Sequence, residues 1–126
     1  MVYVRIISKI LDFFHNRYVE PNSLELVQDI EETLDEVMRK NQKIVGKIYT
    51  SSGYNNQELV SDTVYFAYDC LESVKDKHAD TELVKALLTE IKYRKNDFER
   101  KRHDPDGIVS GTLVDIENAL KEKRLP

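Results

Sequence analysis

The sequence predicts an all-α fold: an antiparallel up-down-up-down four-helix bundle with a short fifth C-terminal helix, in one domain over residues 1–126. Apolar residues recur at spacings of three and four along most of the chain, which is helical periodicity. Four glycines and three prolines are too few for the many tight turns of a β-sandwich. Charged residues make up 33% of the chain, which suits helices with long solvated faces.

The first predicted helix runs from about Val2 to Tyr18 and has an unusually wide apolar face. Its apolar side chains are Tyr3, Val4, Ile6, Ile7, Ile10, Leu11, Phe13 and Phe14. A four-helix bundle buries one stripe per helix, so we expect the surplus to form an interface. Pro21 ends this helix, because the residue before a proline is pushed out of the helical region.

The second predicted helix runs from Leu24 to about Thr50, with Asn22 as N-cap and Glu25 in capping-box position. Alternating spacings of three and four define its seam, which consists of Val27, Ile30, Leu34, Val37, Asn41, Ile44 and Ile48. All but Asn41 are branched and apolar. We interpret this stripe as core as far as Val37, and Asn41 as the start of a polar end.

Three further helices follow. Asn55 caps the third, whose seam is Val60, Val64, Ala67, Leu71, Val74 and His78. Asp80 or Thr81 caps the fourth, whose seam is Val84, Leu87, Ile91, Arg94 and Phe98. After a turn at residues 104–107, a short fifth helix runs from about Thr112 to Lys123, with one apolar side formed by Leu113, Ile116 and Leu120.

Short connections make consecutive helices antiparallel, and they determine which residues of neighbouring helices lie at the same height along the bundle. Asn41 lies level with Thr63, and Thr63 lies level with Asn96, which predicts a polar layer of these three residues. The first helix does not reach that level. The bundle therefore has four helices at one end and three at the other, and we expect the fifth helix to fold over the three-helix end.

Charge is distributed unevenly along the same axis, although the net charge is only −4. That value gives no overall attraction to nucleic acid or to a membrane. Basic residues concentrate at the three-helix end, and the candidate binding residues there are Arg39, Lys43, Arg94, Arg100, Lys101 and Arg102. Compensation of helix dipoles explains most of this layout, and binding of an anionic partner such as nucleic acid is the alternative interpretation.

Two pairs of carboxylates, Glu32 with Asp35 and Asp69 with Glu72, are spaced three residues apart on successive helices. This pattern resembles the metal site of the all-helical nucleotide pyrophosphohydrolases, and the resemblance implies a metal-dependent nucleotide hydrolase. Relative to the apolar seams, however, all four carboxylates fall on outer faces, whereas a divalent cation needs converging oxygens. We therefore predict no catalytic residue, no metal and no cofactor.

The remaining sequence features indicate an intracellular interaction protein. Cys70 is the single cysteine, so no internal disulfide can form and a reducing, cytoplasmic location is expected. No apolar run approaches the ~20 residues of a transmembrane helix, so no membrane association is predicted. The leading prediction is a small non-enzymatic protein-interaction module, adaptor or regulatory, that self-associates as a dimer or binds one protein partner. Nucleic-acid binding and nucleotide hydrolysis are the alternatives, in that order.

Overall fold

The computed structural model describes residues 23–46, 55–102, 104 and 106–123, and it is all-helical over these residues, with no strand. The helices are α2 (Ser23–Val45), α3 (Asn56–Val74), α4 (Asp80–Arg100) and α5 (Ile108–Glu122). The all-α prediction is confirmed for this part of the chain. The predicted first helix lies outside the described residues, so the predicted total of five helices is not tested.

The stripe on α2 is buried as far as the sequence predicts. Ile30 and Leu34 are fully buried, and Val37 is 7% exposed. Ile44, two positions further along the same seam, is 46% exposed, and Ile48 lies outside the described residues. The apolar core on this helix therefore ends near Val37, which confirms the interpretation of the stripe.

Three caps are predicted: Asn22 lies outside the described residues, and of the other two predictions one is correct and one is wrong. Asn55 caps α3, because its side-chain oxygen accepts hydrogen bonds from the backbone N–H groups of Gln57 and Glu58 at 3.1 and 3.3 Å. The cap of α4 is Ala79, in extended conformation and without a side-chain hydrogen bond. Asp80 is therefore inside the first turn, where its negative charge still interacts favourably with the helix dipole.

Helix α5 begins four residues before the predicted Thr112. The side chain of Asp104 accepts hydrogen bonds from the backbone N–H groups of Ile108, Val109 and Ser110 at 2.6, 3.1 and 3.4 Å. Gly107 precedes the helix with a φ of 70°, a left-handed conformation that glycine adopts without strain. One carboxylate thus satisfies three donors at the helix start, which sets the helix boundary.

We expect the substitution Asp104→Ala to lower the free energy of unfolding by about 1–2 kcal/mol, the usual cost of losing a capping side chain. Chemical denaturation monitored by circular dichroism measures the change. Asp106→Ala is the matched control, because Asp106 is an exposed aspartate of the same turn. An equal loss in both variants would contradict the capping role of Asp104.

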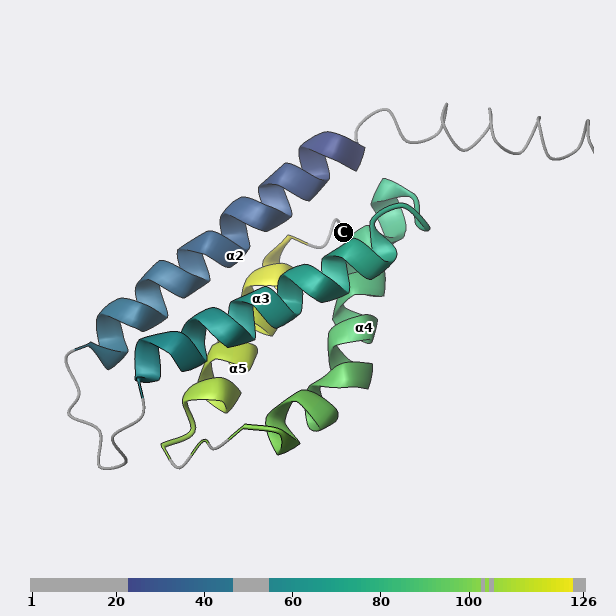
Figure 1. Cartoon of the computed structure of the whole chain (residues 1–126). Helices are drawn as coiled ribbons and strands as arrows, with labels where there is room; N and C mark the ends of the chain where they lie inside the picture. Colours follow the sequence, from purple (N-terminus) through teal and green to yellow (C-terminus); the bar gives the residue numbers. More distant parts are fainter. Residues whose placement is uncertain (1–22, 47–54, 103, 105, 124–126) are drawn as a thin grey trace, which may run out of the picture.

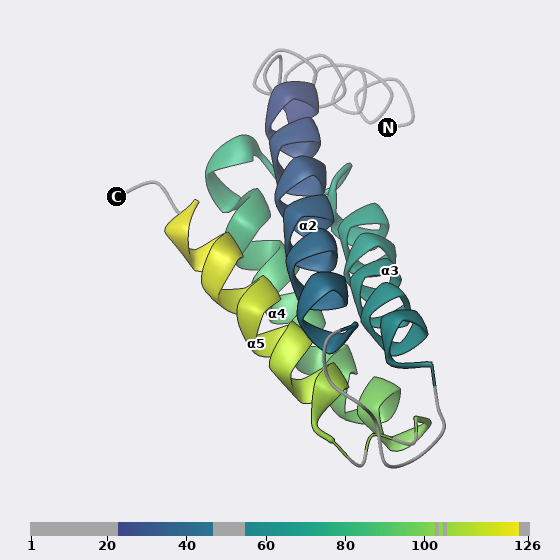
Figure 2. The ribbon, with the colours of Figure 1, turned by 90° about the vertical axis from the view of Figure 1, so that its left-hand side faces the viewer.

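The helices pack so that α5 contacts α2, α3 and α4, while α2 and α4 lie on opposite sides of the α3–α5 pair (Figures 1 and 2). Two side-chain contacts tie α5 antiparallel along α2. The Asn41 amide donates to Asp115 at 3.0 Å, and Lys123 pairs with Asp29 at 2.8 Å. The expectation that the last helix folds over one end is therefore wrong, because α5 runs along the other helices and contributes to their shared core.

The core consists of side chains from all four described helices. Residues exposed by less than 2% include Ile30, Leu34, Val60, Val64, Leu83, Leu87, Ile91, Val109, Ile116 and Leu120. The predicted seams supply most of them, because residues spaced three and four apart lie on one face of a helix. Burial of these apolar side chains is the dominant favourable contribution to the stability of this arrangement.

Thr112 is a polar exception in this core. It is 1% exposed, and its hydroxyl has no hydrogen-bond partner among the described residues. We expect Thr112→Val to raise the free energy of unfolding by about 1 kcal/mol, because a buried polar group without a partner is destabilising. Urea denaturation measures this change.

Thr63→Val is the matched control for Thr112→Val. Thr63 is equally buried, but its hydroxyl donates to the carbonyl of Leu59 at 2.7 Å. Replacing this residue removes a hydrogen bond, so no gain in stability is expected. If both variants gained equally, the unpaired hydroxyl would not be the cause of the effect at Thr112.

Candidate functional site

A groove of about 280 Å³ between α3 and α4 brings aromatic and charged side chains together. Its floor is formed by Phe66 and Phe98, whose rings stack with centroids 4.4 Å apart. Both rings are largely buried. Tyr65 also lines the groove and is 58% exposed. We call this site the α3–α4 groove.

Two arginines reach the aromatic floor from α4 and from the residues just after it. The guanidinium carbon of Arg102 lies 3.9 Å from the centre of the Phe98 ring, and that of Arg94 lies 5.8 Å from the centre of the Phe66 ring. A cation over an aromatic face is attracted by the negative charge of the π-system. The stacked phenylalanines therefore position both cations along the groove.

Carboxylates neutralise part of this positive charge. Asp97 contacts Arg100 at 2.8 Å and Lys101 at 3.1 Å, and these cations hold the pKa of Asp97 below its ordinary value. Arg102 lies 3.9 Å from Asp62 on α3, which is too far for a hydrogen bond. The contact between the two helices at this point is therefore a loose ion pair.

The structure divides the six predicted basic residues between two places. Arg94, Lys101 and Arg102 line the α3–α4 groove, and Arg100 lies beside it through its contact with Asp97. The other two, Arg39 and Lys43, are exposed on α2 and do not line the groove. These residues do not gather at one end. Arg102 lies beside Asp62 near the start of α3, where Gln42 of α2 contacts Ser61, whereas Arg94 contacts Ser73 near the other end of α3. In addition, α2 and α4 lie on opposite sides of α3.

The predicted polar layer does not form. The amide of Asn41 donates to the carbonyl of Val37 and to Asp115 on α5. Thr63 bonds within its own helix, and Asn96 is exposed. Asn41 is nevertheless the place where the α2 seam becomes polar, as the sequence predicts, but its partner comes from α5.

The two predicted pairs of carboxylates do not converge on one point. Glu32, Asp69 and Glu72 are exposed, and Asp35 accepts a hydrogen bond from the Tyr68 hydroxyl at 2.6 Å. Within the described residues, no cluster of three histidine, cysteine or acidic side chains is arranged to hold a metal ion. The geometry that the resemblance to nucleotide pyrophosphohydrolases implies is therefore not found in this part of the chain.

Cys70 is fully buried beside the α3 seam, as the sequence predicts. Burial raises the pKa of its thiol to about 11, although the positive charge of Arg94 acts in the opposite direction. Because the thiolate is the nucleophilic form of cysteine, this residue is inert at neutral pH. We assign it to the core and not to the site.

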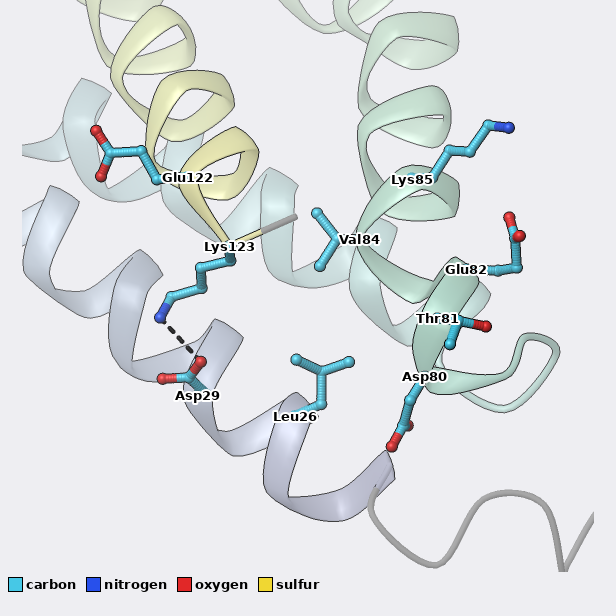
Figure 3. Close-up of a pocket in the computed structure, with 9 residues that line it drawn as sticks. All are labelled: Leu26, Asp29, Asp80, Thr81, Glu82, Val84, Lys85, Glu122 and Lys123. Carbon is cyan, nitrogen blue, oxygen red and sulfur yellow. Dashed lines mark hydrogen bonds and ion pairs between the residues drawn. The ribbon is translucent and has the colours of Figure 1, made fainter. Parts of the chain in front are cut away.

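A larger notch of about 460 Å³ lies where α5 ends, between the first turns of α2 and α4 (Figure 3). Figure 3 shows Lys123 pairing with Asp29 on one side and Leu26 and Val84 between the helices. Asp80 also lines this notch, and burial raises its pKa, with the negative charge of Glu25 adding to the effect. Mixed charges and few apolar side chains give the notch no recognisable ligand chemistry.

Sequence reasoning missed the pairing of Phe66 with Phe98 and the contact of Asp62 with Arg102. The antiparallel alignment of α3 and α4 is the signal that could have located both contacts, because it brings the start of α3 beside the end of α4. Comparisons with known proteins found no matching family model, no matching curated protein and no matching solved structure. No helix among the described residues is both long enough and apolar enough to cross a membrane.

Proposed function

We propose that this chain is a small, non-enzymatic protein-interaction module of the cytoplasm that binds its partner through the α3–α4 groove. One observation carries the proposal: an exposed tyrosine, Tyr65, stands beside a stacked aromatic floor that two arginines contact. Tyrosine and arginine are enriched among the residues that contribute most to protein–protein binding. The cytoplasmic location rests on the single, buried cysteine.

The surroundings of the groove support the same proposal. Tyr93 on α4 is 84% exposed and lies one helical turn before Asp97, a residue of the groove. Two large, exposed aromatic side chains therefore flank a charged and partly apolar depression. A polar rim around an apolar floor is the usual anatomy of a protein interface.

Site-specific photo-crosslinking in the protein's own cells tests this proposal. The change Tyr65→benzoylphenylalanine should yield a covalent adduct with a protein, which mass spectrometry identifies as this chain or another. The matched control is Val114→benzoylphenylalanine, because Val114 is similarly exposed, at 52%, but on α5. Adducts that form equally from both positions, or from neither, would contradict binding at the groove.

The alternative proposal is binding of nucleic acid by the basic residues of α2. Arg39 and Lys43 are exposed, and neither makes an ion pair with another described residue. Such binding would weaken steeply with salt, because counterions are released when phosphates are neutralised. A gel-shift assay at low salt should then show retention of DNA or RNA that is lost in Arg39→Ala/Lys43→Ala, and no retention would exclude this alternative.

The up-down-up-down bundle with an additional helix near the start of the chain also remains a proposal. The apolar periodicity of residues 2–18 favours a helix that joins the described helices in an up-down-up-down arrangement. Its wide apolar face would supply a second surface for association. The α3–α4 groove is described without it, because the described side chains that line the groove belong to α3, α4 or the residues just after α4.

A further inference from the structure

We propose that the partner of the α3–α4 groove is a second copy of this chain, bound about a twofold axis parallel to the two helices. This inference rests on the proposed function and names its partner. Three features carry it: the two walls of the groove have opposite charge, their charged residues are matched in level, and an exposed tyrosine stands on the rim. Each feature comes from described side chains.

The wall contributed by α3 is acidic. Asp62 and Asp69 line the groove at either end of this wall, with Tyr65 between them. Their spacing of seven residues places both carboxylates on one face of the helix. Asp69 is exposed, and the Asp62 side chain is 51% exposed, so both can reach a molecule that docks on the groove.

The opposite wall is mainly basic. Arg94, Lys101 and Arg102 line it, and the acid on this wall, Asp97, is already paired with Lys101 and Arg100. Lys101 is 68% exposed. Among the described residues, the closest carboxylate oxygen to Arg102 lies 3.9 Å from its buried Nε, and the side chain is 30% exposed. The remaining nitrogens of this guanidinium can therefore contact an incoming carboxylate.

Because α3 and α4 are antiparallel, charges of opposite sign lie at matched levels on the two walls. Asp62 lies beside Arg102 at one end of the groove. At the other end, Arg94 contacts Ser73 on α3 at 3.5 Å. Its positive charge also acts to lower the pKa of Cys70, the neighbour of Asp69. The groove is thus acidic along one side and basic along the other.

Only one orientation of a second copy satisfies these charges. Rotation about an axis parallel to the helices keeps each residue at its height along the groove and exchanges the positions of the two walls. The α3 wall of one copy then faces the α4 wall of the other, with Asp62 opposite the partner's Arg102 and Asp69 near the partner's Arg94. Rotation about an axis across the helices would instead place acidic wall on acidic wall, which is repulsive.

The resulting interface is isologous, so each contact occurs twice. In this arrangement α3 of each copy packs against α4 of the other, and Tyr65 of each copy faces the α4 wall of the other at about the level of Phe98. The exposed area of Tyr65 is then buried against this wall, which adds apolar contact to the paired charges. Complementary charge sets the orientation, and the tyrosines supply apolar burial.

A charge-reversal experiment on the purified full chain tests this inference. The acidic wall is reversed in Asp62→Lys/Asp69→Lys, and the basic wall is reversed in Arg94→Glu/Lys101→Glu. Each variant alone should dimerise at least tenfold more weakly than the unmodified chain, because walls of like charge then face each other. An equimolar mixture should form the heterodimer, which native mass spectrometry detects directly.

The matched control is Glu32→Lys/Glu36→Lys, which makes the same change in net charge at two exposed positions of α2. This control should dimerise like the unmodified chain. Helical circular dichroism and the melting temperature verify that every variant is folded. Undiminished dimerisation of the acidic-wall variant, or folded variants whose mixture forms no heterodimer, would overturn the inference.

These outcomes separate the inference from the proposed function. If crosslinking at position 65 captures a different protein and the charge reversals do not affect self-association, the groove is an interaction site but its partner is not a second copy. If neither position 65 nor the charge reversals have any effect, both proposals are wrong. A heterodimer in the mixture supports both.

Discussion

Replacing Leu120 by alanine should lower the free energy of unfolding by about 2–5 kcal/mol, because Leu120 is fully buried and its truncation leaves a cavity in the core. This large effect is expected only if α5 is an integral part of the core. A helix that merely covered one end of the molecule would lose little when one leucine is shortened. Chemical denaturation measures the change directly.

The matched control for Leu120→Ala is Val114→Ala in the same helix. Val114 is 52% exposed, so its truncation should change stability by less than about 0.5 kcal/mol. The comparison cancels any general effect of alanine on the helicity of α5. Equal losses at positions 114 and 120 would show that α5 is peripheral and would contradict its place among the other three helices.

The substitution Tyr68→Phe should lower the free energy of unfolding by about 1–2 kcal/mol, since it removes a half-buried hydroxyl that holds α3 against α2. This hydroxyl lies 2.6 Å from the Asp35 carboxylate and 3.0 Å from the carbonyl oxygen of Glu31. Burial, together with the nearby Asp35, keeps the pKa of Tyr68 above its ordinary value. The phenol therefore stays protonated and remains a donor.

Tyr65→Phe serves as the control for Tyr68→Phe. Tyr65 lies one turn earlier on α3 and is 58% exposed, so loss of its hydroxyl should change stability by less than about 0.5 kcal/mol. Urea denaturation of the two variants isolates the contribution of the bonds between α2 and α3. If Tyr68→Phe were as stable as Tyr65→Phe, those bonds would add nothing to the packing of the two helices.

The sequence predicts the buried faces of the described helices well, because helical periodicity is a local property. Ile30, Val64 and Ile116 all lie on predicted seams, and all are buried. The start of α5 is predicted less well. Its position depends on the side chain of Asp104, which reaches forward to three backbone donors, and such a cap leaves no periodic signal.

The sequence predicts the candidate site only in part, because the height of a residue along the bundle does not determine the direction in which its side chain points. Asn96 is not at the predicted level, because Phe98 stacks on Phe66 and so shifts α4 by more than one turn relative to the predicted alignment. Asn96 also precedes Phe98 by two positions, about 200° around the helix, and it is exposed. Arg39 shares an end with Arg102, but the two lie on opposite sides of α3. The position of α5 beside Asn41 depends on how all the helices pack together, which no single stripe reveals.

The most direct test of self-association through the α3–α4 groove is the molar mass of the purified full chain, measured by light scattering over a dilution series. We expect the mass to rise with concentration from 14.7 kDa toward twice that value, and the transition to shift to higher concentration when salt screens the facing walls. A mass that stays at 14.7 kDa from micromolar to millimolar concentration would contradict self-association.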